Sequence, residues 1–285
     1  MDDNIRMGGF QILPPVIKNL LIINALFFLA KLVVQNFGID LDTWLGLHYF
    51  SAPDFHIWQL VTYMFMHANF GHLFFNMFAL WMFGAVVENY WGTKRFLFYY
   101  FATGIGAGLV HYAVLGYTLQ PDLNLIDAFV ANPDFTNFAN FYQQNHISGL
   151  TPEFRRHLSE CYSYLSANPN DAQALNAVGD QLARLKDDLT NIHVIVGASG
   201  ACFGVMLAFG MLFPNSQIYL YFLIPIKAKW FVLGYGLLEL IFGVTGTADG
   251  IGHFAHLGGM LVGIILILLW RRNDQQRSQD VDEWY

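Results

Sequence analysis

Long apolar stretches recur along the chain and alternate with shorter polar segments. A helix needs about 20 mostly apolar residues to cross the hydrocarbon core of a bilayer. Six stretches come close to this length, and they cover residues 17–36, 71–90, 95–116, 193–213, 229–246 and 252–270. This pattern predicts an all-α polytopic membrane protein, built as a bundle of six transmembrane helices.

The composition agrees with a membrane protein. Of the 285 residues, 55% are hydrophobic and 12% are charged, and this charged fraction is about half of that in a soluble domain. The formal net charge is −7, and no cluster of basic residues interleaves with aromatic ones, so a nucleic-acid partner is not expected. Cys161 lies in a polar region and Cys202 in an apolar stretch, so a disulfide between them is not expected either.

Basic residues indicate the orientation of the chain. Lysine and arginine flank the apolar stretches at the ends that face one side, whereas the loop at 37–57 has neither. By the positive-inside rule, both termini are then cytoplasmic, and we expect an integral protein of the cell (inner) membrane. The predicted parts are a cytoplasmic N-terminal segment (1–16), helices 1–3 with an interfacial first loop (17–116), an outer-side helical insert (117–191), helices 4–6 (192–270) and a cytoplasmic tail (271–285).

The polar insert has its own helical pattern. Apolar residues recur at helical spacing in two runs, which are separated by the turn residues Asn168-Pro169-Asn170. The runs are Phe154, Leu158, Cys161 and Leu165, then Leu175, Val178, Leu182, Leu185 and Leu189. They predict a helical hairpin. Four roles remain open for the insert. It could recruit substrate, cap the site, mediate self-association through 118–190 or serve as a passive spacer.

Serine and histidine residues stand at the heads of apolar stretches. Ser199 lies in Gly197-Ala198-Ser199-Gly200 and is a candidate nucleophile, which needs a base. His256 heads the last stretch and is the comparable partner. His72 and Asn76 are four residues apart, so they share one face of a helix, and the topology puts all four on the outer side. They could donate hydrogen bonds to an oxyanion, although each alone could simply bond to a neighbouring helix.

Three motifs together resemble those of the rhomboid intramembrane serine proteases. They are Gly-X-Ser-Gly at 197–200, Ala-His-X-X-Gly-X-X-X-Gly at 255–263 and His-X-X-X-Asn at 72–76. The resemblance covers roughly 17–116 and 193–270. It implies that Ser199 attacks the scissile carbonyl while His256 acts first as general base and then as general acid. It also implies that His72, Asn76 and the Ser199 backbone N–H form the oxyanion hole.

The resemblance extends to several supporting residues. Phe203 occupies the position of an aromatic ring that stacks on the catalytic histidine, and Glu88 that of a glutamate that tethers the inner end of the second helix. Trp58 resembles the tryptophan of a Trp-Arg pair, but Gln59 stands in place of the arginine, and this leaves the anchoring of the first loop open. Substrate would enter laterally, with the fifth helix and the loop at 247–252 as the gate. The long insert departs from the family pattern.

Other features follow from the residues alone. No acidic residue is obviously placed to orient His256, so packing and a ring stack would hold it. Gly259 and Gly263 form a small-residue face that allows the sixth helix to approach the fourth closely. His67 could support the active site, but it and His253 are rather expected to cap helices or to lie at the wet outer interface. A metal site of these histidines with His72 and His256 is disfavoured, because no carboxylate partner is evident in the helices.

The sequence therefore favours an intramembrane serine endopeptidase that needs no cofactor. Its partners would be the lipid bilayer and the transmembrane or juxtamembrane segments of substrate proteins. The alternative is a catalytically inactive rhomboid-like adaptor that binds membrane clients. A small-solute transporter with intramembrane histidines is a third reading, but no convincing inverted repeat supports it.

Overall fold

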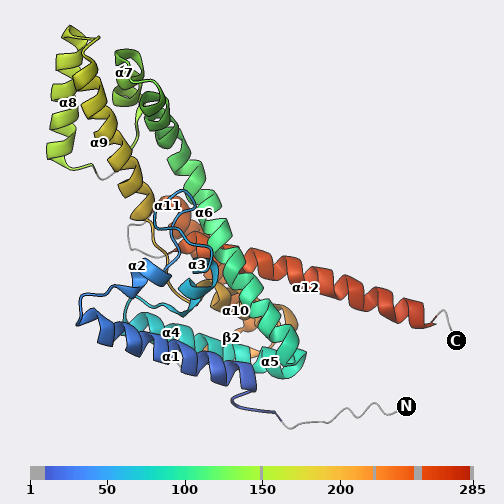
Figure 1. Cartoon of the computed structure of the whole chain (residues 1–285). Helices are drawn as coiled ribbons and strands as arrows, with labels where there is room; N and C mark the ends of the chain where they lie inside the picture. The colour runs from blue at the N-terminus through green and yellow to red at the C-terminus, as the bar shows by residue number, and fades with distance from the viewer. Residues whose placement is uncertain (1–9, 148–149, 221–222, 247–251, 283–285) are drawn as a thin grey trace. The chain divides into compact units, whose positions relative to one another are not determined.

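The computed structural model describes residues 10–147, 150–220, 223–246 and 252–282. Helices make up most of these residues (Figure 1). In chain order, the elements are α1 (Pro15–Gln35), α2 (Leu41–Leu45), α3 (Gln59–Thr62), η1 (Tyr63–Phe65), α4 (Phe70–Ala79), η2 (Leu80–Gly84), α5 (Ala85–Trp91), α6 (Thr93–Ala131), α7 (Phe135–Gln144), α8 (Pro152–Ala167), α9 (Ala172–Asn191), α10 (Ser199–Leu212), β1 (Gln217–Leu220), β2 (Ile224–Lys227), α11 (Ala228–Thr245) and α12 (His253–Asp282).

The all-α polytopic architecture is confirmed. Among the described residues, five helical segments are long and apolar enough to cross a membrane, and they span Pro15–Gln35, Phe70–Trp91, Thr93–Ala131, Ala228–Thr245 and His253–Arg272. The helix α10 is equally apolar but has only 14 residues, fewer than the roughly 20 that a full crossing needs. The sixth crossing therefore stays a prediction.

Three boundaries differ from the predicted ones. The last helix was expected to end at residue 270, but α12 continues to Asp282. The fourth apolar stretch was expected to be helical from residue 193, but its helix begins at Ser199. Ile195 instead exchanges two backbone hydrogen bonds of 3.0 Å with Leu47, which holds this segment extended. The third helix was expected to end near 116, but α6 continues to Ala131. The part of α6 beyond residue 116 contributes Phe129 to a second hydrophobic core. This packing stabilises the helix where its sequence is polar.

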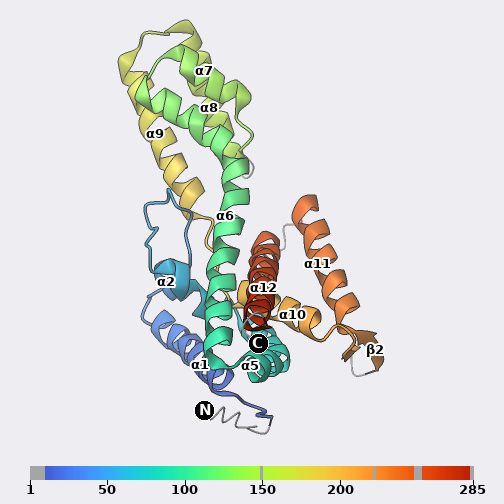
Figure 2. The same cartoon turned by 90° about the vertical axis from the view of Figure 1, so that its right-hand side faces the viewer.

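The chain divides into two compact units, and the first contains residues 1–47, 56–111 and 194–285. Within this unit, α10 contacts α12, α11 and the continuous α4–η2–α5 helix (Figure 2). Most of the α10 side chains are buried. Because α10 is enclosed by other helices, a functional group at its N-terminus is held by several neighbours at once.

Glycines allow the helices of this unit to pack closely against one another. A Cβ atom on Gly259 of α12 would overlap the backbone carbonyl of Gly200 on α10, so only glycine fits there. A Cβ atom on Gly263 would overlap the Tyr99 hydroxyl of α6 and approach Leu207 of α10 at 3.3 Å. The predicted close approach of the last helix to α10 is confirmed at Gly259.

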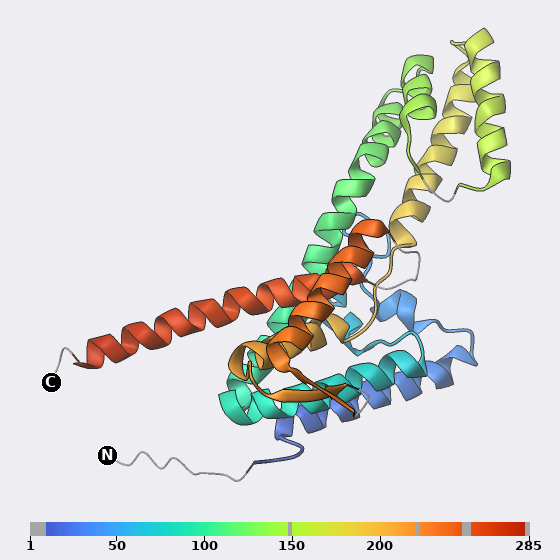
Figure 3. The same cartoon turned by 180° about the vertical axis from the view of Figure 1, so that it is seen from behind.

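A short antiparallel hairpin, β1–β2, connects α10 to α11 (Figure 3). The sequence analysis did not predict it. Its register pairs Gln217 with Lys227 and Ile218 with Ile226. The Ala228 N–H donates to the Ser216 carbonyl at 2.8 Å, which brings the start of α11 back to the end of α10.

Glu88 and Gln59 both have anchoring contacts in the first unit. The Glu88 carboxylate accepts the backbone N–H groups of Val16 at 3.0 Å and Ile17 at 2.9 Å, at the otherwise unpaired start of α1. Gln59 is fully buried and accepts the His56 N–H at 3.1 Å. Its amide also donates to the Trp44 carbonyl at 3.4 Å. Glutamine therefore anchors the first loop through hydrogen bonds of its own.

The second unit contains residues 48–55 and 112–193. The predicted hairpin is present as α8 and α9, and Thr151 caps α8 by accepting the Phe154 N–H at 3.2 Å. The helix α7 was not predicted. The core of the unit is formed by Ile126, Phe129, Phe138, Phe141, Ile147, Leu158, Leu165, Leu175, Val178 and Leu182. The unit thus has a hydrophobic core of its own, to which the last turns of α6 contribute.

Candidate active site

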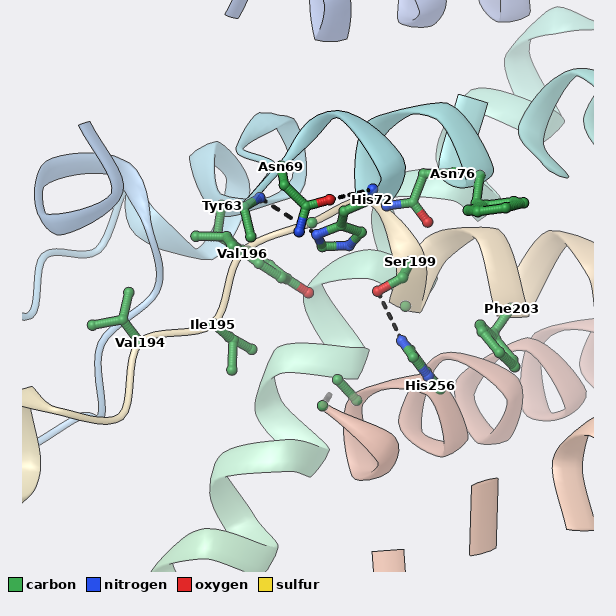
Figure 4. Close-up of a pocket in the computed structure, with 16 residues that line it drawn as sticks. Tyr63, Asn69, His72, Asn76, Val194, Ile195, Val196, Ser199, Phe203 and His256 are labelled. Carbon is green, nitrogen blue, oxygen red and sulfur yellow. Dashed lines mark hydrogen bonds between the residues drawn. The ribbon is translucent and has the colours of Figure 1, made fainter. Parts of the chain in front are cut away.

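A cavity of about 560 Å³ lies at the N-terminus of α10 in the first unit. Ser199 and His256 face each other across it, and His72, Asn76 and Phe203 also line it (Figure 4). These side chains come from three helices, α4, α10 and α12. The structure therefore brings the sequence-predicted site residues into one cavity.

Ser199 and His256 are within hydrogen-bonding distance. The Ser199 Oγ lies 2.9 Å from the His256 Nε2. Both side chains are held by the tight α10–α12 contact, in which Gly200 packs directly on Gly259. A general base must be about 2.6–3.2 Å from the proton that it takes. The pair meets this geometric requirement.

The other ring nitrogen of His256 has an acidic partner that the sequence analysis missed. The Nδ1 atom lies 2.9 Å from the Glu239 Oε2, and Glu239 comes from α11. The expectation that no acidic residue orients His256 is therefore wrong. Glu239 is the only acidic residue in the stretch 229–246, and an isolated carboxylate in an apolar helix is costly to bury. The presence of a carboxylate in this apolar stretch was the signal that could have identified Glu239 as a site residue.

Phe203 stacks on the imidazole of His256. The two ring centroids are 4.2 Å apart and the planes differ by 6°. Because Phe203 is one turn along α10 from Ser199, the same helix carries the serine and the ring that limits rotation of the histidine. Packing and hydrogen bonding thus act on His256 together.

His72 faces Gly197, the first residue of the predicted serine motif. Gly197 has a φ of +127°, which disfavours any other residue, and a Cβ atom there would lie 2.7 Å from the His72 Nε2. The Nδ1 of His72 faces the Ala68 backbone N–H at 3.4 Å. If Nδ1 accepts, the proton of the neutral ring is on Nε2, which points to the serine side of the cavity.

Two further groups of donors face the cavity. The Asn76 side chain is buried, and its Nδ2 has no hydrogen-bond partner among the described residues. The first N–H groups of α10 have no partner within the helix, since an α-helix leaves its first four N–H groups free. Together with the partial positive charge of the helix N-terminus, they favour a developing negative charge.

Lys31 of α1 holds the segment that precedes His72. It is buried, its Nζ lies 2.5 Å from the Asp42 carboxylate, and it donates to the His67 carbonyl at 2.9 Å. It also lies 3.4 Å from the Ala68 carbonyl. The sequence analysis overlooked Lys31, although a lysine within an apolar stretch is a signal of the same kind as Glu239.

His67 and His253 are not at a wet interface, as was expected, because both are buried. The His67 ring lies 5.0 Å from that of His72. Burial, with a smaller contribution from His72, lowers the pKa of His67 to about 3. His253 begins α12, and its Nδ1 lies 2.7 Å from the Glu239 Oε2. Each therefore packs inside the protein beside a member of the site.

One group of described residues could hold a metal ion by position, namely Glu239, His253 and His256. The premise that the helices offer no carboxylate partner is thus wrong. However, the separations of 2.7 and 2.9 Å between carboxylate oxygen and imidazole nitrogens are those of hydrogen bonds. Three ligands of one metal ion would each lie about 2.0–2.2 Å from the ion and farther from one another.

Comparison with known proteins identifies the family. The rhomboid domain matches residues 54–121 and 164–273, which is more than half of the chain. Three relatives illustrate the range of similarity. The mitochondrial RHOMBOID-like protein 12 of Arabidopsis thaliana is 26% identical over 262 residues, covering 88% of this chain and 56% of its own. An uncharacterized mitochondrial rhomboid protein of Schizosaccharomyces pombe is 24% identical, covering 75% and 52%. The rhomboid protease GlpG of Haemophilus influenzae is 27% identical, covering 37% and 63%.

The chain spans about half the length of the first two of these relatives. The matched ranges contain Ser199, His256, His72 and Asn76. Apolar helices long enough to cross a bilayer make it an integral membrane protein. The chain belongs to the rhomboid family.

Proposed function

We propose that this rhomboid protein is a serine endopeptidase that cleaves transmembrane or juxtamembrane segments of membrane proteins. The observation that carries the proposal is the 2.9 Å contact between the Ser199 Oγ and the His256 Nε2 in a cavity at a helix N-terminus. In this mechanism, His256 takes the proton of Ser199 as its oxygen attacks the scissile carbonyl. The protonated ring then donates to the leaving amine, and water hydrolyses the acyl-enzyme.

The negative oxygen of the tetrahedral intermediate would be stabilised by donors around the cavity. The candidates are the His72 Nε2–H, the Asn76 Nδ2 and the Ser199 backbone N–H. Preorganised donors of this kind each contribute about 3–4 kcal/mol to transition-state stabilisation in other serine proteases. The proposal requires no cofactor.

An apolar groove supports lateral entry of a substrate helix. Phe75 and Phe78 of the second membrane helix, with Phe231 and Tyr235 of α11, line a cleft of about 660 Å³. Phe75 also lines the cavity of Ser199. A transmembrane segment docked in the groove would therefore lead to the site. Of the predicted gate loop 247–252, only Gly252 lies within the described residues.

The test is cleavage of transmembrane substrates by the purified protein in liposomes. Ser199→Ala and His256→Ala should each lower cleavage at least about 1,000-fold, while Ser216→Ala, at an exposed serine beyond α10, should not change it. The inactive-adaptor alternative predicts binding of clients without cleavage by any of these proteins. Normal turnover by Ser199→Ala would contradict the proposed mechanism.

Four expectations remain predictions. They are that both termini are cytoplasmic, that the insert lies on the outer side, that the protein is in the cell membrane and that it self-associates through 118–190. The charge pattern supports the orientation, because the loop at 37–57 lacks lysine and arginine. Reporter fusions at each terminus and in the insert would test the orientation directly.

A further inference from the structure

Glu239 is a buried carboxylate whose single oxygen contacts two imidazoles. The residue is 9% exposed, and its Oε2 lies 2.7 Å from the Nδ1 of His253 and 2.9 Å from the Nδ1 of His256. It does not line the cavity of Ser199. The hydrogen bonds of the Glu239 carboxylate therefore reach the site through the two histidines.

With Glu239 ionised, the geometry selects the nitrogen of neutral His256 that carries the proton. A carboxylate oxygen accepts hydrogen bonds when ionised, so each facing Nδ1 must carry a proton. For neutral His256, this leaves the Nε2 lone pair free to accept the Ser199 hydroxyl proton, 2.9 Å away. The opposite tautomer would put the proton on Nε2 and could not act as the base.

We propose that Glu239 is a positioning residue that orients His256, selects this tautomer and stabilises the imidazolium formed during catalysis. The inference rests on the proposed protease function. It replaces a serine-histidine pair held by packing alone with a charge-assisted Ser199–His256–Glu239 arrangement. His253 donates to the same oxygen and holds the carboxylate in place.

The helix that carries Glu239 gives the arrangement a further property. Ser199 lies on α10 and His256 on α12, whereas Glu239 lies on α11. Only 17% of the residues of α11 are buried, so this helix has few neighbours that hold it in place. Displacement of α11 would take the carboxylate away while leaving serine and histidine on their own helices. The reactivity of Ser199 should therefore depend on the position of α11.

Two variants separate charge from geometry. Glu239→Gln keeps an oxygen that can accept both hydrogen bonds but removes the charge, whereas Glu239→Ala removes both. Leu240→Ala, the exposed next residue of α11, is the matched control. The readouts are the rate of fluorophosphonate labelling of Ser199 and kcat and KM for a transmembrane substrate, with folding checked by thermal unfolding.

We expect labelling and kcat to fall about 10-fold in Glu239→Gln and about 100-fold in Glu239→Ala. KM should be unchanged, because Glu239 does not line the cavity. Leu240→Ala should match the wild type. If the alanine variant does not fold, the glutamine variant carries the test.

The pH profile distinguishes a charge effect from a structural one. The groups that face His256 are Ser199, Glu239 and His253, with His72 nearby across the cavity. Removing the negative charge makes protonation of the imidazole less favourable. In the pH profile of the labelling rate, the acid limb should therefore move to lower pH in Glu239→Gln and stay in place in Leu240→Ala.

Wild-type labelling rates in both Glu239 variants, an unmoved acid limb, or a change in KM alone would each overturn the inference. These results differ from failure of the proposed function, in which the wild-type protein itself would neither be labelled nor cleave. An active wild type with unaffected Glu239 variants would leave the serine-histidine mechanism intact.

Discussion

At the scale of single residues, the site depends on backbone shape as much as on reactive side chains. Gly197 has a positive φ and contacts the ring of His72, so two separate constraints act on one residue. A side chain at this position would both strain the backbone and push the proposed oxyanion donor away.

Gly197→Ala should lower kcat at least about 10-fold, because the added Cβ atom displaces His72. Gly38 is the matched control, since it also has a positive φ, of 76°, but a Cβ atom there meets nothing within 4 Å. Gly38→Ala should lose some thermal stability and keep its activity. Equal activity of the two variants would exclude this role for Gly197.

Stability should fall in mild acid because of His67. The folded protein holds His67 neutral, with a pKa of about 3, whereas the ordinary value is 6.5. The unfolded chain therefore binds more protons as the pH falls below about 6.5, and the folded state loses stability down to about pH 3. The midpoint of thermal unfolding in detergent should drop by roughly 5–10 °C from pH 7 to pH 4.

His67→Gln should flatten this pH dependence, since it removes the titrating group. His56→Gln, at an exposed histidine, should leave the dependence as it is. An identical drop in the His67 variant would assign the acid sensitivity to other groups.

The sequence indicated the residues of the proposed reaction but not their electrostatic partners. Ser199 and His256 were predictable because each heads an apolar stretch, and the predicted topology puts both on the same side. Glu239 and Lys31 belong to no motif, and their partners lie 11 or more residues away and on other elements. Only the folded arrangement shows what each buried charge contacts.

At the scale of elements, the α10–α12 contact positions the site. A Cβ atom on Gly259 would overlap the backbone of Gly200, which cannot move as a flexible side chain can. Gly259→Ala should therefore separate the two helices and lower labelling of Ser199 at least about 100-fold. Gly234 of α11 has nothing within 4 Å of an added Cβ atom, so Gly234→Ala should remain fully active.

Full labelling of Gly259→Ala would show that the helices can separate without loss of the site. The measurement should include thermal unfolding, because overpacking at Gly259 also costs about 1–3 kcal/mol of stability.

Helix positions were largely predictable from apolar periodicity, whereas helix ends were not. The start of α10 depends on the pairing of Ile195 with Leu47, a contact between residues that are distant in the sequence. The extension of α6 depends on packing in the second unit. The β1–β2 hairpin has only four residues in each strand, too few for a clear alternating pattern.

At the scale of the whole molecule, the second unit has its own hydrophobic core. The Tyr112 hydroxyl donates to the His193 carbonyl at 2.8 Å, so the two ends of this segment lie together. Replacing residues 118–190 with a short glycine-serine linker should therefore leave the first unit folded and Ser199 reactive.

Cleavage of several transmembrane substrates by this deletion variant would reveal the role of the insert. Selective loss of some substrates would indicate recruitment, and unchanged cleavage would indicate a spacer. Loss of fluorophosphonate labelling would contradict the expectation that the first unit folds without the insert.

The most direct measurement of the central claim is covalent labelling of the purified, membrane-reconstituted protein with a fluorophosphonate, followed by mass spectrometry. The account predicts a single adduct on Ser199 and no adduct in His256→Ala, because only a serine with a base at 2.9 Å is activated. An unlabelled wild-type protein, or an equal adduct in His256→Ala, would contradict it.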